Sequence, residues 1–157
     1  MSRETRATRV LQQAGVSFTL HSYAYDPDAA QIGLQAAAAI GEAPGRVLKT
    51  LMAKLDGKPV CAIIPSDHEL SMKKLAAAMG GKSAQMMAPA EAERLSGYVV
   101  GGISPFGQKR TLPTAIEAGA LAHDLIYLNG GQRGLQVRMD PAEAVRVLGA
   151  MVADLVA

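Results

Sequence analysis

The chain has 157 residues, of which 49% are hydrophobic and 19% charged, and its net charge is +2. This composition excludes a disordered chain and a coiled coil, and the length suits a single domain over residues 1–157. No apolar run approaches the roughly 20 residues that span a bilayer, and no apolar signal segment follows the N-terminus. Only one cysteine is present. We therefore expect a cytoplasmic protein without membrane partner or disulfide.

An amphipathic pattern predicts a helix over residues 5–14, which Gly15 can end. Strict alternation of apolar and polar residues over 16–23 then predicts a half-buried strand. The alanine-rich segment 34–40 is expected to be helical. The first third of the chain therefore alternates helix, strand and helix.

An apolar run over residues 47–55 predicts a strand that contains Lys49. Asp56-Gly57 is typical of a two-residue hairpin turn, so residues 60–64 are expected to form the returning strand. The two segments together predict an antiparallel hairpin.

The rest of the chain mixes short helices with short strands. The predicted helices cover residues 72–79, 89–95 and 141–155, and the predicted strands cover residues 84–87, 114–117, 125–128 and 135–139. Asp140 and Glu143 form a capping-box pattern at the last helix. Seven strands and five helices, with hairpins among helical crossovers, predict an α+β fold with a mixed sheet or open barrel-like core flanked by helices.

Lys49 stands in an otherwise apolar strand. A lysine beside a cleft can stabilise developing negative charge. It can equally be an edge-strand lysine that faces water and opposes aggregation. The spacing alone leaves both interpretations open.

The loop over residues 99–107 (VVGGISPFG) offers paired glycines, whose backbone amides can approach a ligand closely. An ordinary turn built from glycine and proline is the alternative. The turn over residues 130–134 is interpreted as a hairpin connection.

Several other polar residues are assigned no chemistry. Cys61 lies in an apolar strand and is expected to pack in the core. Asp67-His68-Glu69 is interpreted as a solvated loop. The cysteine and the histidines show no metal-ligand spacing, so we expect no metal.

At this point the sequence resembles the single-domain aminoacyl-tRNA deacylases of the YbaK type, or Cys-tRNA(Pro) deacylases, which are related to the editing domain of prolyl-tRNA synthetase. The matching blocks, in chain order, are residues 18–23 (FTLHSY), 47–51 (VLKTL), 70–75 (LSMKKL), 97–110 (GYVVGGISPFGQKR), 112–114 (LPT), 126–127 (IY) and 130–135 (GGQRGL). The resemblance implies the same mixed β-barrel-like core with helices. It also implies hydrolysis of the ester that joins an amino acid to the terminal ribose of tRNA.

The resemblance also implies which residues act. The catalytic residues would be Lys49, Gly101 and Gly102. The substrate-binding residues would be Tyr23, Thr50, Ser104, Pro105 and Tyr127. Two positions depart from the pattern, since Gln136 stands where relatives often carry an acidic residue and Ile32 where some carry an aromatic one.

The implied partners are the 3′ end of an aminoacylated tRNA and prolyl-tRNA synthetase, with no cofactor and no DNA. Aromatic residues make up only 4% of the chain, so we expect modest, salt-dependent RNA affinity. The implied mechanism has the thiolate of the substrate cysteine attack its own ester, with a positioned water as the alternative. A deacylase for alanine or serine, and a non-catalytic module that binds a synthetase or tRNA, remain the other hypotheses.

Overall fold

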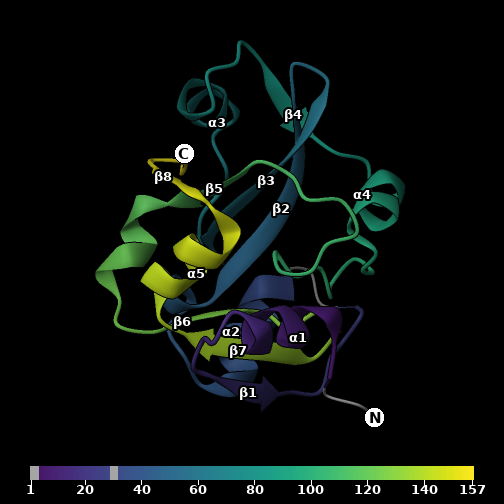
Figure 1. Ribbon diagram of the computed structural model, residues 1–157, viewed down its shortest axis with the longest axis vertical. Helices are drawn as coiled ribbons and strands as arrows, with labels where there is room; N and C mark the ends of the chain where they lie inside the picture. The colour runs from purple at the N-terminus through teal and green to yellow at the C-terminus, as the bar shows by residue number, and fades with distance from the viewer. Residues whose placement is uncertain (1–3, 29–31) are drawn as a thin grey trace.

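The computed structural model describes residues 4–28 and 32–157 (Figure 1). In this part of the chain the helices are α1 (Arg6–Gln13), α2 (Ile32–Ile40), α3 (Met72–Ala78), α4 (Pro89–Ser96) and α5 (Pro141–Leu148), with short 3₁₀ helices over Pro44–Arg46 and Ala118–Ala122. The strands are β1 (Phe18–Ser22), β2 (Leu48–Leu55), β3 (Lys58–Pro65), β4 (Ala84–Met86), β5 (Thr114–Glu117), β6 (Ile126–Asn129), β7 (Leu135–Met139) and β8 (Met151–Ala153). None of these helices is long and apolar enough to cross a membrane.

The strands form two open sheets. The smaller has the order β1-β7-β6 and is antiparallel throughout; the larger has the order β4-β2-β3-β5-β8, with β5 parallel to both neighbours. A parallel bridge between Val47 and Tyr127 joins the start of β2 to the smaller sheet. The predicted α+β fold with an open, mixed core is therefore confirmed.

One edge of β2 is only partly covered. On one side β3 pairs with the whole strand, from Leu48 to Leu55. On the other side β4 pairs only with the last three residues, from Ala53 onward, and β6 reaches only Val47. The segment between these two contacts therefore leaves part of a strand edge open for a ligand.

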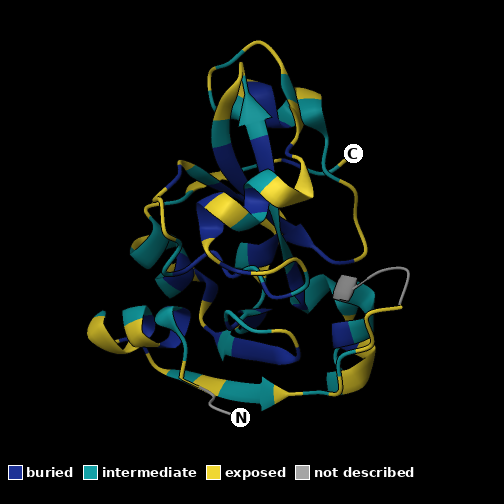
Figure 2. Cartoon of the chain, turned by 90° about the vertical axis from the view of Figure 1, so that its right-hand side faces the viewer, coloured by how far each residue is buried: buried dark blue, intermediate teal, exposed yellow. Residues whose placement is uncertain are grey.

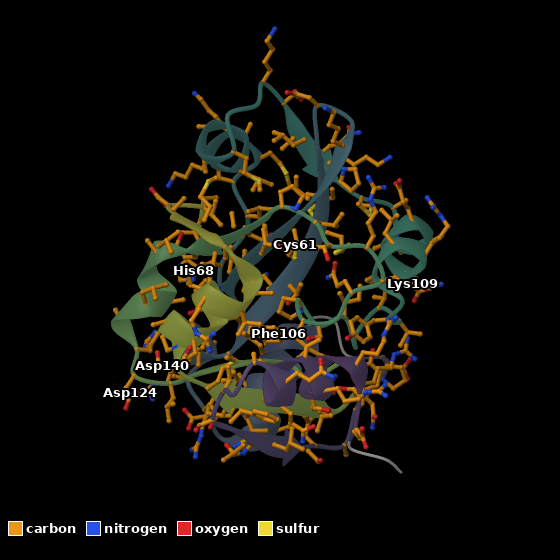
Figure 3. All side chains as sticks on the ribbon, viewed as in Figure 1. Cys61, His68, Phe106, Lys109, Asp124 and Asp140 are labelled. Carbon is orange, nitrogen blue, oxygen red and sulfur yellow. The ribbon has the colours of Figure 1, made fainter. Side chains whose placement is uncertain are left out.

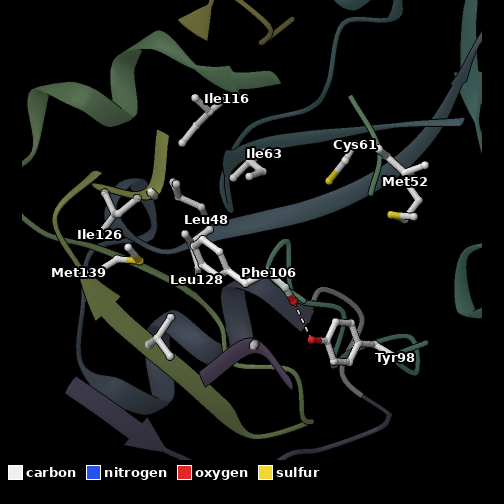
Figure 4. Close-up of a cluster of buried hydrophobic side chains, with 14 of the residues drawn as sticks. Leu48, Met52, Cys61, Ile63, Tyr98, Phe106, Ile116, Ile126, Leu128 and Met139 are labelled. Atoms are coloured by element: carbon white, nitrogen blue, oxygen red, sulfur yellow. Dashed lines mark hydrogen bonds between the residues drawn. The ribbon is translucent and has the colours of Figure 1, made fainter. Parts of the chain in front are cut away.

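The main core lies between the two sheets, under α1, α4 and α5 (Figures 2 and 4). Phe106 is buried there among side chains from both sheets, and the Tyr98 hydroxyl donates a hydrogen bond of 2.6 Å to the Phe106 carbonyl. This bond joins the two ends of the glycine-containing loop, so the loop is fixed by the core beneath it. A second, smaller apolar cluster packs α3 against the opposite face of the larger sheet.

Both predicted hairpins are confirmed, at Asp56-Gly57 between β2 and β3 and at residues 130–134 between β6 and β7. Asp56 and Gly57 both have positive φ angles, 50° and 81°, as a type I′ turn requires.

The prediction of a last helix over 141–155 is wrong. Helix α5 ends at Leu148 because Gly149 adopts the left-handed conformation, with a φ of 60°. The following residues form β8, an edge strand parallel to β5. The predicted capping box is also absent among the described contacts. The Asp140 carboxylate accepts a hydrogen bond from the Ala142 amide, whereas the Glu143 carboxylate accepts one from the Arg146 side chain.

Candidate active site

A cavity of about 320 Å³ lies at the open edge of β2. Most of its described lining comes from the end of β1, from β2, from the β4–α4 region and from the loop over residues 99–107, called the glycine loop below. Single residues of α2, β6 and β7 complete the lining. The lining residues are Tyr23, Ala36, Val47, Leu48, Lys49, Thr50, Leu51, Met52, Met86, Met87, Pro89, Ala92, Val100, Gly101, Ile103, Asn129 and Gln136. This volume lies at the small end of the range that is typical of ligand pockets.

Lys49 is the only charged side chain among these lining residues. It is half-buried, and within residues 4–28 and 32–157 it forms no ion pair. Of the two interpretations, a lysine beside a cleft fits this position. An unpaired ammonium next to an apolar cavity can attract or stabilise negative charge there.

Thr50 follows Lys49 on the same strand, and successive side chains point to opposite faces. Both line the cavity because it wraps around the open edge of β2. The Met52 carbonyl accepts a hydrogen bond from Met87 on this side. Since alternate residues direct their backbone groups the same way, the Thr50 amide and carbonyl also point toward the open edge.

Three buried side-chain atoms lack a hydrogen-bond partner in the described part of the chain: the Tyr23 hydroxyl, Thr50 Oγ1 and Gln136 Oε1. All three residues line the cavity. A buried polar group without a partner costs roughly 1–3 kcal/mol, so such groups require an explanation. Their gathering around one cavity indicates that a polar ligand completes their bonding.

Burial raises the pKa of Tyr23, while the Gln136 side chain lies close enough to lower it in part without reaching hydrogen-bonding geometry. The phenol therefore stays protonated at neutral pH. It can donate or accept a hydrogen bond in the cavity, but it is a poor nucleophile.

The glycine loop needs both of its glycines. Gly101 has a φ of 90°, and a Cβ there would lie 2.5 Å from the Tyr25 hydroxyl. A Cβ on Gly102 would lie 2.8 Å from the backbone nitrogen of Arg133. The loop can therefore pack this closely against Tyr25 and against the backbone of Gln132 and Arg133 only because side chains are absent at both positions.

The two glycine amides differ in availability. The Gly102 amide donates to the Val99 carbonyl and closes a turn, so it is not free to bind an ester. No described residue accepts a hydrogen bond from the Gly101 amide. The Asn129 side chain donates to the Gly101 carbonyl over 3.2 Å and holds this residue in place.

The other predicted substrate-binding residues lie outside the cavity lining. Ser104 is fully buried and accepts a hydrogen bond from the Phe106 amide, and Pro105 borders a separate hollow beside α1 and α5. Tyr127 is buried with its hydroxyl 3.3 Å from Glu42. None of these three residues lines the cavity.

Two polar lining residues, Asn129 and Gln136, are not among the predicted site residues. In the sequence Gln136 stands out only as a departure from a family pattern, and Asn129 does not stand out at all. Neither position carries a clear signal, because Gln136 alternates with Arg138 on the polar face of β7 and Asn129 is the last residue of β6. The side chain of Ile32, the second departure, lies outside the described residues.

Cys61 is buried, as predicted, and burial raises the pKa of its thiol to about 12 (Figure 3). Asp67 and His68 are exposed and contact each other over 2.8 Å. Neither Cys61 nor this pair lines the cavity.

We expect native Cys61 to resist alkylation by iodoacetamide at pH 8, because the thiol is buried and protonated, and to react rapidly once the protein is unfolded. The raised pKa also lowers stability in alkali. An unfolded thiol ionises near pH 9.0, whereas the native thiol resists ionisation up to about pH 12. Between these two pH values ionisation of the thiol favours the unfolded state, so the free energy of unfolding falls as the pH rises. Cys61→Val should remove this part of the fall while deacylation persists. Fast labelling of the native protein would contradict the buried position.

Comparison with known proteins places this site in a family. A profile of the aminoacyl-tRNA editing domain matches residues 26–147. A relative from Enterococcus faecalis, named as a candidate Cys-tRNA(Pro)/Cys-tRNA(Cys) deacylase, EbsC, is 31% identical over 98% of this chain and 93% of its own. The multifunctional Ser/Thr-tRNA deacylase ProXp-y of Escherichia coli K12 is 30% identical over 68% of this chain and 67% of its own.

The fold gives the same result. A solved structure described as a candidate trans-editing enzyme for prolyl-tRNA synthetase superposes with a TM-score of 0.81 and 25% identity, over 99% of both chains. Sequence and structure agree over nearly the whole chain, so the protein belongs to the aminoacyl-tRNA editing domain family.

Proposed function

We propose that this protein is a trans-editing deacylase that hydrolyses the ester between cysteine and the 3′-terminal ribose of tRNA, with Cys-tRNA(Pro) as the main substrate and Cys-tRNA(Cys) as a second. The observation that carries the proposal is a small, mainly apolar cavity whose only described charge is Lys49. A synthetase pocket separates cysteine from the similarly sized proline poorly, so a second, hydrolytic site is useful.

Lys49 and Gly101 are assigned to the reacting ester. The ammonium stabilises negative charge that develops during ester cleavage, and the Gly101 amide is a donor for the carbonyl oxygen. Tyr23, Thr50 and Gln136 supply the polar atoms that orient the bound aminoacyl group. Gly102, Ser104, Pro105 and Tyr127 do not line the cavity, and the proposal gives them a positioning role.

The described cavity lining contains no Cys, Ser, His, Asp or Glu. Thr50 is the remaining hydroxyl of ordinary nucleophilic type, and its oxygen has no described partner that could accept its proton. The substrate thiol is therefore the better nucleophile, because Lys49 favours its ionised form. The thiolate attacks the ester carbonyl and forms a four-membered thiolactone. The bond to the ribose oxygen breaks, and this oxygen takes up the proton that the thiol lost. Water then opens the thiolactone and releases cysteine.

A second candidate is the deacylation of seryl-tRNA. The unpartnered hydroxyls of Tyr23 and Thr50 could bind a substrate hydroxyl, and the ProXp-y relative is named for serine and threonine. In that case a positioned water would attack the ester, with Lys49 and Gly101 holding the carbonyl.

The proposed setting is the cytoplasm, where the protein would act in trans beside prolyl-tRNA synthetase. The fold match to a structure described as a trans-editing enzyme for that synthetase supports this partner.

The proposal is tested with purified protein and a panel of cysteinyl-, alanyl-, seryl- and prolyl-tRNA, with and without prolyl-tRNA synthetase. We expect cysteinyl ester to be released fastest, and faster still on tRNA(Pro) when the synthetase is present. A protein that binds tRNA but releases no amino acid would be a binding module and would contradict the proposal.

Thr50→Val should separate stability from function. The Thr50 hydroxyl is buried without a partner, so replacing it with a methyl group should raise the free energy of unfolding by about 1 kcal/mol and lower deacylation. Thr114→Val is the matched control, because the Thr114 hydroxyl donates to the Leu112 carbonyl and its loss should destabilise the fold. Chemical denaturation and deacylation assays measure the two effects; wild-type activity in Thr50→Val would remove Thr50 from the site.

A further inference from the structure

Three exposed apolar side chains lie at the cavity or next to a residue that lines it. Met86, Val99 and Val100 are 47%, 49% and 40% exposed, and both Met86 and Val100 also line the cavity. Large apolar side chains that cluster on a surface mark a binding site more often than single ones do. These three residues, with Arg133 beside them, are called the rim below.

Arg133 is exposed but held in place. Its guanidinium carbon lies 5.2 Å from the centre of the Tyr25 ring, and its Nε donates a hydrogen bond of 2.9 Å to the Val100 carbonyl. No carboxylate pairs with it in the described residues. The two terminal nitrogens of the guanidinium therefore remain for another acceptor, and their position is set before any ligand arrives.

The position of Arg133 is fixed relative to the cavity. Tyr25, on which it stacks, packs against Gly101, and Val100, which it binds, is a lining residue. The guanidinium is thus bound to the residue that precedes Gly101, the proposed donor to the ester carbonyl.

We propose that the rim binds the terminal nucleotide of the tRNA acceptor end, with Arg133 on its phosphate and the apolar side chains against its base. This inference rests on the proposed function. An ester held in the cavity attaches the amino acid to the terminal ribose, so that ribose must lie at the mouth and its base and phosphate must lie on the rim. An arginine fork suits phosphate oxygens, and apolar surface suits a base of any identity.

Neighbouring charges decide on which side the phosphate lies. The Glu93 carboxylate accepts a hydrogen bond from the Val100 amide, so negative charge occupies the α4 side of the rim. That charge repels a phosphate, whereas Arg133, which binds the carbonyl of the same residue, attracts it. The base is therefore left to the apolar side chains.

The test uses Arg133→Gln, Arg133→Lys and the control Arg138→Gln, which changes an arginine of β7 outside the cavity lining. With cysteinyl-tRNA, Arg133→Gln should raise KM about tenfold at unchanged kcat, because one charge-assisted contact to the bound substrate is lost. Arg133→Lys should recover part of this loss, and Arg138→Gln should match the wild type.

Binding of an RNA oligonucleotide with a 3′-CCA end, followed by fluorescence anisotropy, gives a readout that is independent of hydrolysis. Loss of one phosphate contact should make the plot of log affinity against log salt shallower by about 0.7 for Arg133→Gln. Val99→Ser should raise KM by a smaller factor of about three without changing this slope.

Wild-type KM and salt slope in Arg133→Gln would overturn the phosphate contact. A fall in kcat at unchanged KM, equal in Arg133→Gln and Arg133→Lys, would show instead that Arg133 only shapes the loop through Val100. If Arg133→Gln made the salt plot of oligonucleotide binding shallower as expected, but the wild type released no amino acid from any tRNA, the proposed function would fail while the rim assignment stood.

Discussion

Lys49→Ala should lower kcat/KM for cysteinyl-tRNA by about 10²- to 10³-fold while the protein remains folded. The reason is local: Lys49 supplies the only described charge in the lining of an otherwise neutral cavity. When it is removed, no charged side chain remains in the described lining to stabilise the thiolate or the developing oxyanion. Because Lys49 forms no described ion pair, its loss should change the free energy of unfolding little.

Lys54→Ala is the matched control on the same strand. The Lys54 ammonium lies 2.8 Å from the Glu91 carboxylate, and Lys54 does not line the cavity. Its activity should therefore stay near the wild-type value. Lys49→Met adds a further comparison, because it retains most of the apolar stem and removes only the charge. A folded Lys49→Ala protein with wild-type activity would exclude the assigned role.

Most of the fold could be predicted because local patterns and tertiary structure agree. The β2–β3 hairpin follows from an Asp-Gly turn between two apolar runs, and α1 follows from its amphipathic pattern. The last helix was predicted too long because its apolar positions continue past Gly149. The left-handed conformation of that glycine ends the helix, and the pairing of β8 with β5 depends on a contact distant in sequence.

The candidate site was predictable only in part. Lys49, Thr50, Tyr23 and Gly101 were proposed from a family resemblance, and the structure brings all four to one cavity. Ser104 is close to Gly101 in sequence, but the chain enters the core there because Phe106 is anchored in it, so Ser104 is fully buried and does not line the cavity.

Gln136 illustrates the other limit. The alternation in β7 places Gln136 on the face opposite to Leu135, Val137 and Met139, which predicts an exposed side chain, whereas the structure buries it beside the cavity. The open edge of β2 is likewise invisible in the sequence, since it depends on how short the pairing with β4 is.

Replacing cysteinyl-tRNA by seryl-tRNA should reduce the rate steeply, although the two side chains differ by one atom. A thiol with an ordinary pKa of about 8.5 is partly ionised near neutral pH, whereas a hydroxyl is not. Lys49 should lower the pKa of the bound thiol further, because a cation favours the ionised form. Attack within one molecule also gains from proximity, and this gain disappears when the nucleophile is not ionised.

The pH profile and an alkylated substrate test the same point. With cysteinyl-tRNA, kcat should rise with pH and level off below pH 8.5, as the bound thiol becomes fully ionised, and Lys49→Ala should move this midpoint upward. S-methylcysteinyl-tRNA adds a single methyl group and cannot form a thiolate, so its ester should survive. Similar rates for cysteinyl- and seryl-tRNA, or cleavage of the methylated substrate, would show that the thiol does not attack. A water molecule positioned by Lys49 and the Gly101 amide would then be the nucleophile, and the unpartnered hydroxyls of Tyr23 and Thr50 would select the side chain rather than orient a thiolate.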